Sequence, residues 1–302
     1  MSFPGLPALY RLLVTGLVVL GALMSLAAQA EPTMPVSFGE ILTLESRIPD
    51  RSLRYGSEPS QTAALWLPLG RQRREGEMPL LVLVHGGCWL KAYSAEHVYP
   101  LATALSRDGY AVFVPEYRRV GEKGGGWPGT AADILHALEV LADQVLPGVS
   151  REHTVLVGHS AGGHLALWAA GRDSTLLPPG ITIVGAVGLA AIVDLETYAR
   201  GDSSCQRATP ALMGATPEQA PDRYAQASPA RRALRVPTLL LRGSDDPIVG
   251  VEQLHALGGA QTLEVAGAGH FDWLHPETPA YAVLRDAVFD VLSHSYSGVD
   301  PQ

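Results

Sequence analysis

The sequence VLVGHSAGGHLALW, residues 155–168, carries a serine between two glycines at the point where its pattern changes. The run before Ser160 is short and apolar, which favours a buried strand, and the residues after it favour a helix. Gly158 and Gly162 fit a sharp turn at Ser160, because such a turn brings the neighbouring backbone too close for a Cβ atom. The stretch therefore predicts a strand, a tight turn and a helix, with the serine hydroxyl above the end of the strand.

Apolar runs and helical spacings alternate along the rest of the chain. Strands are predicted at 61–68, 79–85, 110–117, 153–160, 181–192, 236–243 and 261–267. Helices are predicted at 94–108, at 130–146, after Ser160, between the last two strands, and from Pro279 to about Ser293. This alternation predicts an α/β fold with a mostly parallel central sheet and helices on both faces.

Residues 194–233 interrupt the alternation between two late strands. Prolines from Pro210 to Pro229 divide this segment into short helical pieces. We expect the insertion to form a small lid over the strand ends. The segment from about Glu31 to Pro59 is rich in Pro and Ser, and we expect it to run over the surface.

The first thirty residues have the layout of a secretory signal peptide. Arg11 precedes the uncharged run from Leu12 to Leu26, and the small-residue pattern Ala28-Gln29-Ala30 follows it. We expect residues 1–30 to be removed and the protein to be exported, to a periplasm or to the medium. An uncleaved anchor is the alternative, but the apolar run is shorter than the about 20 residues that a bilayer span needs. Residues 31–302 then predict a single domain.

The bulk composition limits the class of protein and its partners. A hydrophobic content of 47% with 17% charged residues is typical of a globular protein. The net charge of −8 disfavours nucleic acid and anionic membranes as partners. Export would allow Cys88 and Cys205 to form a disulfide, but the sequence leaves two buried thiols equally open. The histidines beside Ser160 belong to no metal-ligand cluster, so we expect neither a metal nor a cofactor.

A serine hydroxyl is a weak nucleophile unless a base lies beside it. Where a serine turn of this kind ends a strand of a parallel sheet, the acid and then the histidine follow it in the chain. His270 lies in a glycine loop just after the strand 261–267, which places it at the same edge of the sheet as Ser160. The sequence therefore predicts His270 as the base, with His275 as the alternative.

The base in turn needs an acid to orient it. Asp245 and Asp246 both follow the strand 236–243, one strand before His270. We prefer Asp246, because it fits a G-x-x-D-x-x-V spacing from Gly243 to Val249. Asp194 is a third candidate, and we expect it to cap a helix or contact the lid.

The loop HGGCW, residues 85–89, follows the strand 79–85 and supplies candidate oxyanion donors. Two glycines allow backbone N–H groups to point into the site, whereas His85 is expected to be a structural hydrogen bonder. The predicted oxyanion hole comprises amides of Gly86, Gly87, Cys88 and Ala161. Large apolar side chains in or near the same loops predict a substrate pocket formed by Trp89, Trp127, Met213 and Trp273.

Taken together and in this order, the motifs resemble the α/β-hydrolase superfamily. The resemblance is to the H-G-G-x-W esterases of its esterase/lipase and kynurenine-formamidase-like branch. It covers nearly all of the chain after residue 30 and implies the α/β-hydrolase fold, a Ser160–Asp246–His270 triad and an oxyanion hole at the H-G-G loop. The residues that carry it are HGGCW (85–89), EYRRVGEKGGGWPGT (116–130), GHSAGGHLALW (158–168), GSDDPIV (243–249) and GAGHFDWLHP (267–276).

The expected function is that of a serine hydrolase that cleaves short-chain or aryl carboxylic esters through an acyl-enzyme, with a small-molecule ester as its partner. An arylformamidase or another amidase-type hydrolase with the same triad is the alternative. Kynurenine formamidases act inside cells, so the predicted export favours the ester hydrolase. A binding protein on the same scaffold is disfavoured, because all three triad positions are filled. The sequence specifies neither the acyl chain nor the oligomeric state.

Overall fold

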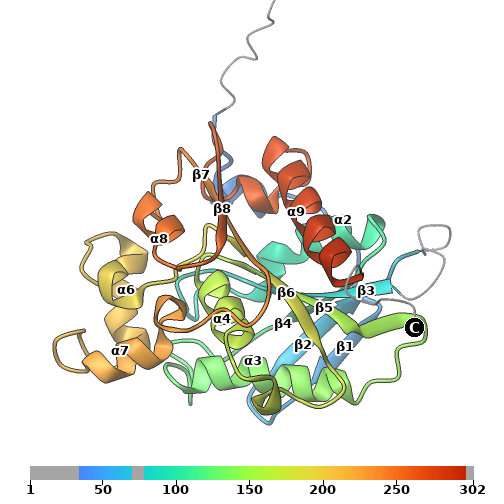
Figure 1. Cartoon of the computed structure of the whole chain (residues 1–302), viewed down its shortest axis with the longest axis horizontal. Helices are drawn as coiled ribbons and strands as arrows, with labels where there is room; N and C mark the ends of the chain where they lie inside the picture. The colour runs from blue at the N-terminus through green and yellow to red at the C-terminus, as the bar shows by residue number, and fades with distance from the viewer. Residues whose placement is uncertain (1–33, 70–77, 297–302) are drawn as a thin grey trace, which may run out of the picture. The chain divides into compact units, whose positions relative to one another are not determined.

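The computed structural model describes residues 34–69 and 78–296. They contain an eight-stranded sheet with the strand order β1-β2-β4-β3-β5-β6-β7-β8 (Figure 1). β1 and β2 are antiparallel to their neighbours, and all later pairings are parallel. The strands are β1 (Arg51–Arg54), β2 (Thr62–Trp66), β3 (Met78–Val84), β4 (Ala111–Pro115), β5 (Val149–His159), β6 (Ile183–Leu189), β7 (Thr238–Gly243) and β8 (Gln261–Val265). The predicted mostly parallel α/β sheet is confirmed.

Helices cover both faces of this sheet. In Figure 1, α2 and α9 lie on one side of it, and α3 and α4 lie on the other. The longer helices are α2 (Tyr99–Arg107), α3 (Gly129–Ala142), α4 (Ala161–Ala170), α6 (Ser204–Met213) and α9 (Pro279–Tyr296). The shorter pieces are α1 (Phe38–Ile41), η2 (Ala95–Val98), η3 (Ser174–Leu176), α5 (Leu195–Tyr198), α7 (Pro221–Ala227), η4 (Pro229–Arg231), α8 (Val251–His255) and η5 (Asp272–Leu274).

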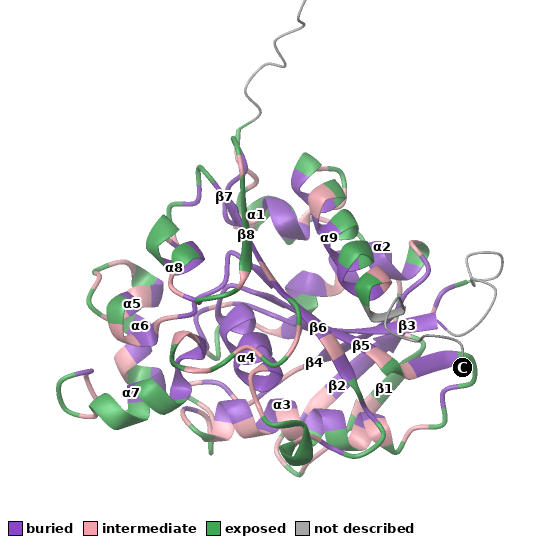
Figure 2. Ribbon diagram, viewed as in Figure 1, coloured by how far each residue is buried: buried purple, intermediate pink, exposed green. Residues whose placement is uncertain are grey.

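The core has two layers because each central strand is apolar on both faces. Every residue of β3 is buried (Figure 2). Leu80 and Val82 pack in the cluster that includes α3 and α4, whereas Leu81 and Leu83 pack with α2 and α9. This alternation places one residue on each face in turn, so a continuous apolar run gives a strand that is covered on both sides.

The carboxyl ends of the parallel strands meet at one edge of the sheet. The H-G-G loop follows β3, Ser160 follows β5, Asp246 follows β7 and His270 follows β8. The insertion at 194–233, between β6 and β7, contains α5, α6, α7 and η4. Parallel topology therefore gathers segments that are far apart in the sequence.

Two sequence expectations concern the N-terminal part of the chain. The segment before β2 does more than run over the surface, because it contributes α1 and the edge strand β1. The expected signal peptide at 1–30 lies outside the described residues. Among the helices that the structure describes, none is both long and apolar enough to cross a membrane.

Candidate active site

Ser160 occupies the sharp turn between β5 and α4. Its backbone angles are φ 55° and ψ −119°, a strained conformation for a residue with a Cβ atom. Its N–H donates a hydrogen bond of 2.8 Å to the carbonyl of Leu189, which anchors the turn to β6. A Cβ atom on Gly158 would lie 2.3 Å from the carbonyl oxygen of Gly162, and one on Gly162 would lie 2.1 Å from that of Val84. The turn therefore requires glycine at both positions.

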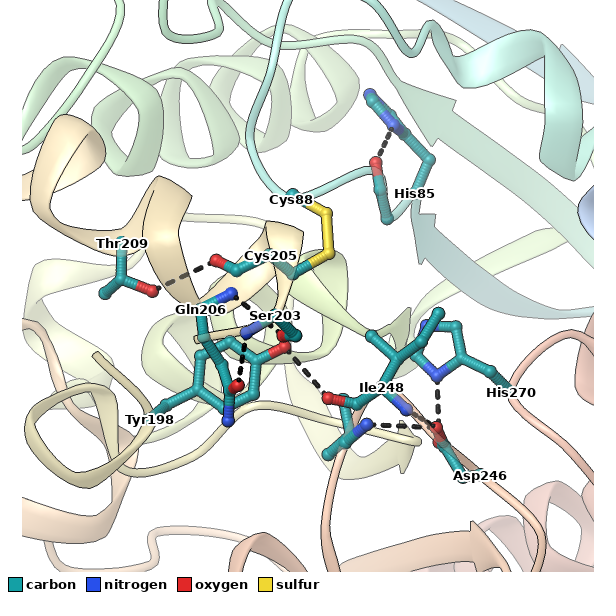
Figure 3. Close-up of a disulfide and its surroundings, with 12 residues drawn as sticks. His85, Cys88, Tyr198, Ser203, Cys205, Gln206, Thr209, Asp246, Ile248 and His270 are labelled. Carbon is teal, nitrogen blue, oxygen red and sulfur yellow. Dashed lines mark hydrogen bonds and ion pairs between the residues drawn. A yellow bond between two sulfur atoms is a disulfide. The ribbon is translucent and has the colours of Figure 1, made fainter. Parts of the chain in front are cut away.

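His270 and Asp246 lie in direct contact although they come from different loops. His270 Nδ1 is 2.8 Å from Asp246 Oδ2 (Figure 3). Asp246 Oδ1 accepts the backbone N–H groups of Ile248 and Val249 at 2.8 and 2.9 Å. Because a carboxylate accepts from Nδ1–H, the neutral imidazole carries its free lone pair on Nε2. His270 is thus oriented as a base.

The alternative acid and base residues make other contacts. Asp245 is exposed and accepts the hydroxyl of Ser244 at 2.7 Å. His275 Nδ1 accepts the N–H of Glu277 at 3.2 Å. The carboxylate of Asp194 caps α5, as expected. Of the predicted acids and histidines, the structure brings together Asp246 and His270.

Ser160 and His270 line one small cavity of about 130 Å³. Among the described residues, no hydrogen bond joins the Ser160 hydroxyl to His270 or to another protein group, and Ser160 lines the cavity. The other lining residues are Phe38, Gly87, Cys88, Tyr93, His97, His159, Ser204, Cys205, Ile248 and Phe271.

The H-G-G loop lies beside the serine and presents unused N–H groups. Gly87 and Cys88 have φ angles of 99° and 53°, and both residues line the cavity. A Cβ atom on Gly86 would lie 3.2 Å from Cβ of Ser160, and the Gly86 carbonyl contacts the ring of His85 at 2.8 Å. In the described part of the chain, no acceptor is bound by the amides of Gly87, Cys88 or Ala161. These amides can therefore bind an oxyanion next to Ser160.

His85 anchors the start of the H-G-G loop. Its Nε2 lies 2.8 Å from a carboxylate oxygen of Glu116, and its carbonyl accepts the hydroxyl of Tyr117 at 2.9 Å. Burial would raise the pKa of Glu116, but the attraction of His85 and the hydrogen bonds outweigh burial and lower this pKa to about 2. The second Glu116 oxygen accepts the N–H of Ala95. His85 is therefore a structural hydrogen bonder, as its position in the loop suggests.

A disulfide joins the H-G-G loop to the insertion at 194–233. Cys88 and Cys205 form this bond, with their Cα atoms 4.9 Å apart (Figure 3). Cys205 lies on α6, and both cysteines line the cavity beside Ser160. The bond therefore ties the start of α6, which lines the cavity, to the loop segment that carries Gly87 and Cys88.

The four side chains expected to form the substrate pocket lie outside this cavity. Trp89 is fully buried and donates its indole N–H to His164 Nδ1 at 3.2 Å. Trp127 lines a separate surface hollow beside α7. Met213 and Trp273 are buried in the two core clusters. Large apolar side chains next to the active-site loops are thus used to pack the loops against the core.

The cavity walls come instead from residues that the motifs did not identify. They include Phe38 on α1, Tyr93, His97 on η2, and Phe271 next to the base. Burial, and secondly the charge of His85, lowers the pKa of His97 to about 3, so this ring is neutral near pH 7. Phe271 could have been found from its place beside His270, whereas Phe38 lies in no motif.

His159, the residue before the serine, supports the base. Its Nε2 lies 2.9 Å from the carbonyl oxygen of His270, and the two ring centroids are 4.6 Å apart. Burial, together with the charge of His270, lowers the pKa of His159 well below its usual value. His159 therefore stays neutral and holds the His270 loop without competing for its proton.

Comparisons with known proteins agree with this architecture. Esterase LipC of Mycobacterium tuberculosis is 28% identical over 249 residues, which are 74% of this chain and 60% of that protein. The chain thus spans about 60% of the length of that curated relative.

Solved structures share the fold at lower identity. Esterase B from Lactobacillus rhamnosis HN001 superposes with a TM-score of 0.68 at 20% identity, and the match covers 83% of this chain and 89% of that one. Esterase 2 of Thermogutta terrifontis, phosphonylated by sarin, superposes with a TM-score of 0.64 at 18% identity, and the match covers 85% of this chain and 98% of that one.

A family model decides the assignment. The model of the BD-FAE family matches residues 67–260, more than half of the chain. The resemblance of the motifs to α/β-hydrolase esterases is therefore confirmed. This protein is a member of the BD-FAE family of α/β-hydrolase-like esterases.

Proposed function

We propose that the protein is a serine carboxylesterase that cleaves short-chain or aryl esters of small molecules. The observation that carries the proposal is the contact of 2.8 Å between His270 Nδ1 and Asp246 Oδ2, at a cavity that Ser160 also lines. A serine, an imidazole with its lone pair free, and a buried carboxylate are the groups that acyl transfer needs. The esterase names of the relatives support the same reaction class.

The reaction begins with attack of Ser160 Oγ on the ester carbonyl carbon, while His270 Nε2 takes the hydroxyl proton. The tetrahedral oxyanion accepts hydrogen bonds from the amides of Gly87, Cys88 and Ala161. His270 then gives its proton to the leaving alcohol, which departs as the acyl-enzyme forms. His270 next takes a proton from a water molecule as the water oxygen attacks the acyl carbonyl carbon. It returns this proton to Ser160 Oγ as the bond to the serine breaks and the carboxylic acid leaves. Asp246 stabilises the imidazolium throughout.

The test is hydrolysis of p-nitrophenyl esters from acetate to decanoate, with Ser160→Ala measured beside the wild type. Activity that is absent from Ser160→Ala supports the proposal, and wild-type activity no higher than that of Ser160→Ala with every ester contradicts it. Formanilide substrates of matched size distinguish an arylformamidase, which would use the same three residues.

Asp246 has a matched control in its neighbour. Asp246→Asn is expected to lower kcat about 10³–10⁴-fold, because the imidazole loses its orienting acceptor. Asp245→Asn, at an exposed carboxylate, is expected to keep wild-type kcat. Equal losses in both variants would contradict the assignment of Asp246.

We further propose that residues 1–30 are an export signal and that residues 194–233 form a lid over the site. The Cys88–Cys205 disulfide supports export, because such bonds persist in oxidising compartments. The position of Cys205 at the cavity supports the lid. The mass of the protein recovered from its native host tests the export proposal, and a mass that includes residues 1–30 would contradict cleavage.

A further inference from the structure

Two hollows lie side by side at the active site and share one wall. The catalytic cavity measures about 130 Å³. A second hollow of about 280 Å³ adjoins it. The residues that line both are Phe38, Tyr93 and His97. These three side chains therefore separate the space beside Ser160 from a second space that is twice as large.

Phe38 is the member of this wall that comes from a separate segment. Its ring centroid lies 5.5 Å from that of Tyr93, 5.6 Å from that of His97 and 5.4 Å from that of Phe271. Tyr93 also packs against the H-G-G loop, because a Cβ atom on Gly87 would lie 2.4 Å from Tyr93 Cβ. Phe38 can thus be shortened without removing a side chain that packs on the oxyanion loop.

The segment that carries Phe38 is held at the site by its backbone. The N–H of Val36 donates to Asp272 Oδ2 at 3.0 Å, and the same oxygen accepts the N–H of Gly269 at 3.0 Å. Ser37 and Glu40 form a capping box around α1. Phe38 therefore has a fixed position in the wall.

The second hollow has a mixed lining. Ile41, Leu42, Leu44 and Pro100 supply apolar surface on which an alkyl chain could pack, and Ser46, Ser94 and Glu96 supply polar groups. The catalytic cavity alone is smaller than the roughly 300–1,000 Å³ of usual ligand pockets, so it accepts only a small acyl group. Space for a longer chain, with apolar side chains in part of its lining, lies next to it behind Phe38.

We propose that Phe38 is a specificity-determining residue that limits the acyl chain by closing the catalytic cavity toward the second hollow. This inference rests on the proposed esterase function. Shortening Phe38 joins the two spaces, and a medium-length acyl chain then extends along Ile41, Leu42 and Leu44.

The test compares kcat/KM for p-nitrophenyl acetate and octanoate in the wild type, Phe38→Leu and Phe38→Ala. We expect the octanoate-to-acetate ratio to rise at least about tenfold in Phe38→Ala, because each methylene in an apolar pocket changes the rate about tenfold or more. The octanoate-to-acetate ratio of Phe38→Leu is expected to lie between those of the wild type and Phe38→Ala. For acetate alone, kcat/KM is expected to change only a few-fold. Phe289→Ala is the matched control, because Phe289 is 54% exposed on α9 and lines neither hollow.

The outcomes separate this inference from the proposed function. An unchanged ratio in a folded Phe38→Ala, with wild-type acetate activity, overturns the inference alone. An equal loss for both esters also overturns it, because Phe38 would then support the fold of the site and not its size. A wild type that hydrolyses no ester more than Ser160→Ala does overturns the proposed function and this inference with it. Thermal melting of each variant shows whether it is folded.

Discussion

Removal of the disulfide by Cys205→Ala is expected to cost a large part of the protein's stability. The bond joins residues separated by 117 positions. Closing a loop of that length removes roughly 16 cal/mol/K of entropy from the unfolded chain, or about 5 kcal/mol at 25 °C. For a domain of this size each kcal/mol corresponds to about 2–4 °C, so we expect Tm to fall by about 10–20 °C.

The same substitution is expected to lower esterase activity below Tm. Cys88 stands in the oxyanion loop, whose residues Gly87 and Cys88 line the cavity, and the disulfide ties this loop to α6. A loop released from α6 samples positions in which its amides no longer meet the oxyanion. Loss of one such donor typically costs about 10²–10³ in kcat, and the loop carries two of the proposed donors, Gly87 and Cys88.

Calorimetry in the absence and presence of dithiothreitol measures the stability change, and thiol titration confirms that the bond is broken. The reduced wild type and Cys205→Ala are expected to have the same Tm. Dithiothreitol is expected to leave the Tm of Cys205→Ala unchanged. A wild type with both thiols titrated but a Tm within about 2 °C of the oxidised protein would refute the reasoning, because the loop-entropy contribution would then be absent.

Two further substitutions test the turn at the serine and a buried histidine. Gly162→Ala places a Cβ atom 2.1 Å from a β3 carbonyl, so we expect destabilisation of about 3 kcal/mol, the upper end of the usual range for overpacking. Gly258→Ala is the control because its Cβ atom enters open space, and equal Tm values for the two variants would contradict the steric argument. Burial lowers the pKa of His164 to about 4, and its Nδ1 already accepts the indole N–H of Trp89. Between pH 6.5 and about 4, this histidine binds a proton in the unfolded chain but stays neutral in the folded chain. The free energy of unfolding therefore falls as the pH is lowered through this range, by up to about 1.4 kcal/mol per pH unit from this residue. Urea unfolding at pH 7, 6 and 5 is expected to show a shallower slope for His164→Gln, and an identical slope would rule out this contribution.

Most of the fold could be predicted because the central strands of the sheet are largely buried. A continuous apolar run such as 79–85, bounded by turn residues, favours a strand that is covered on both faces. β1 was missed for the opposite reason. Its sequence RSLR has one apolar residue, and its side chains are mostly exposed. It is a strand because it pairs with β2 at the edge of the sheet, which no local pattern reveals.

The residues of the candidate site also fall into two groups, those that the sequence predicts and those that it does not. The spacing of the turn and loop motifs indicated Ser160, Asp246 and His270. In the structure Ser160 and His270 line one cavity, and Asp246 contacts His270. The cavity walls depend on which distant segments pack together. Trp89 lies beside the oxyanion loop in sequence but turns into the core, whereas Phe38 reaches the site from a segment without a motif.

The carboxylate of Asp272 links two parts of the site that would otherwise be independent. One of its oxygens accepts N–H groups from Val36, next to the segment that carries Phe38, and from Gly269, next to the base. A sequence change that moves this N-terminal segment also moves the backbone that presents His270. Evolution of a new acyl preference is therefore constrained: it can proceed by changing the size of side chain 38, but displacement of the segment itself would misplace the base.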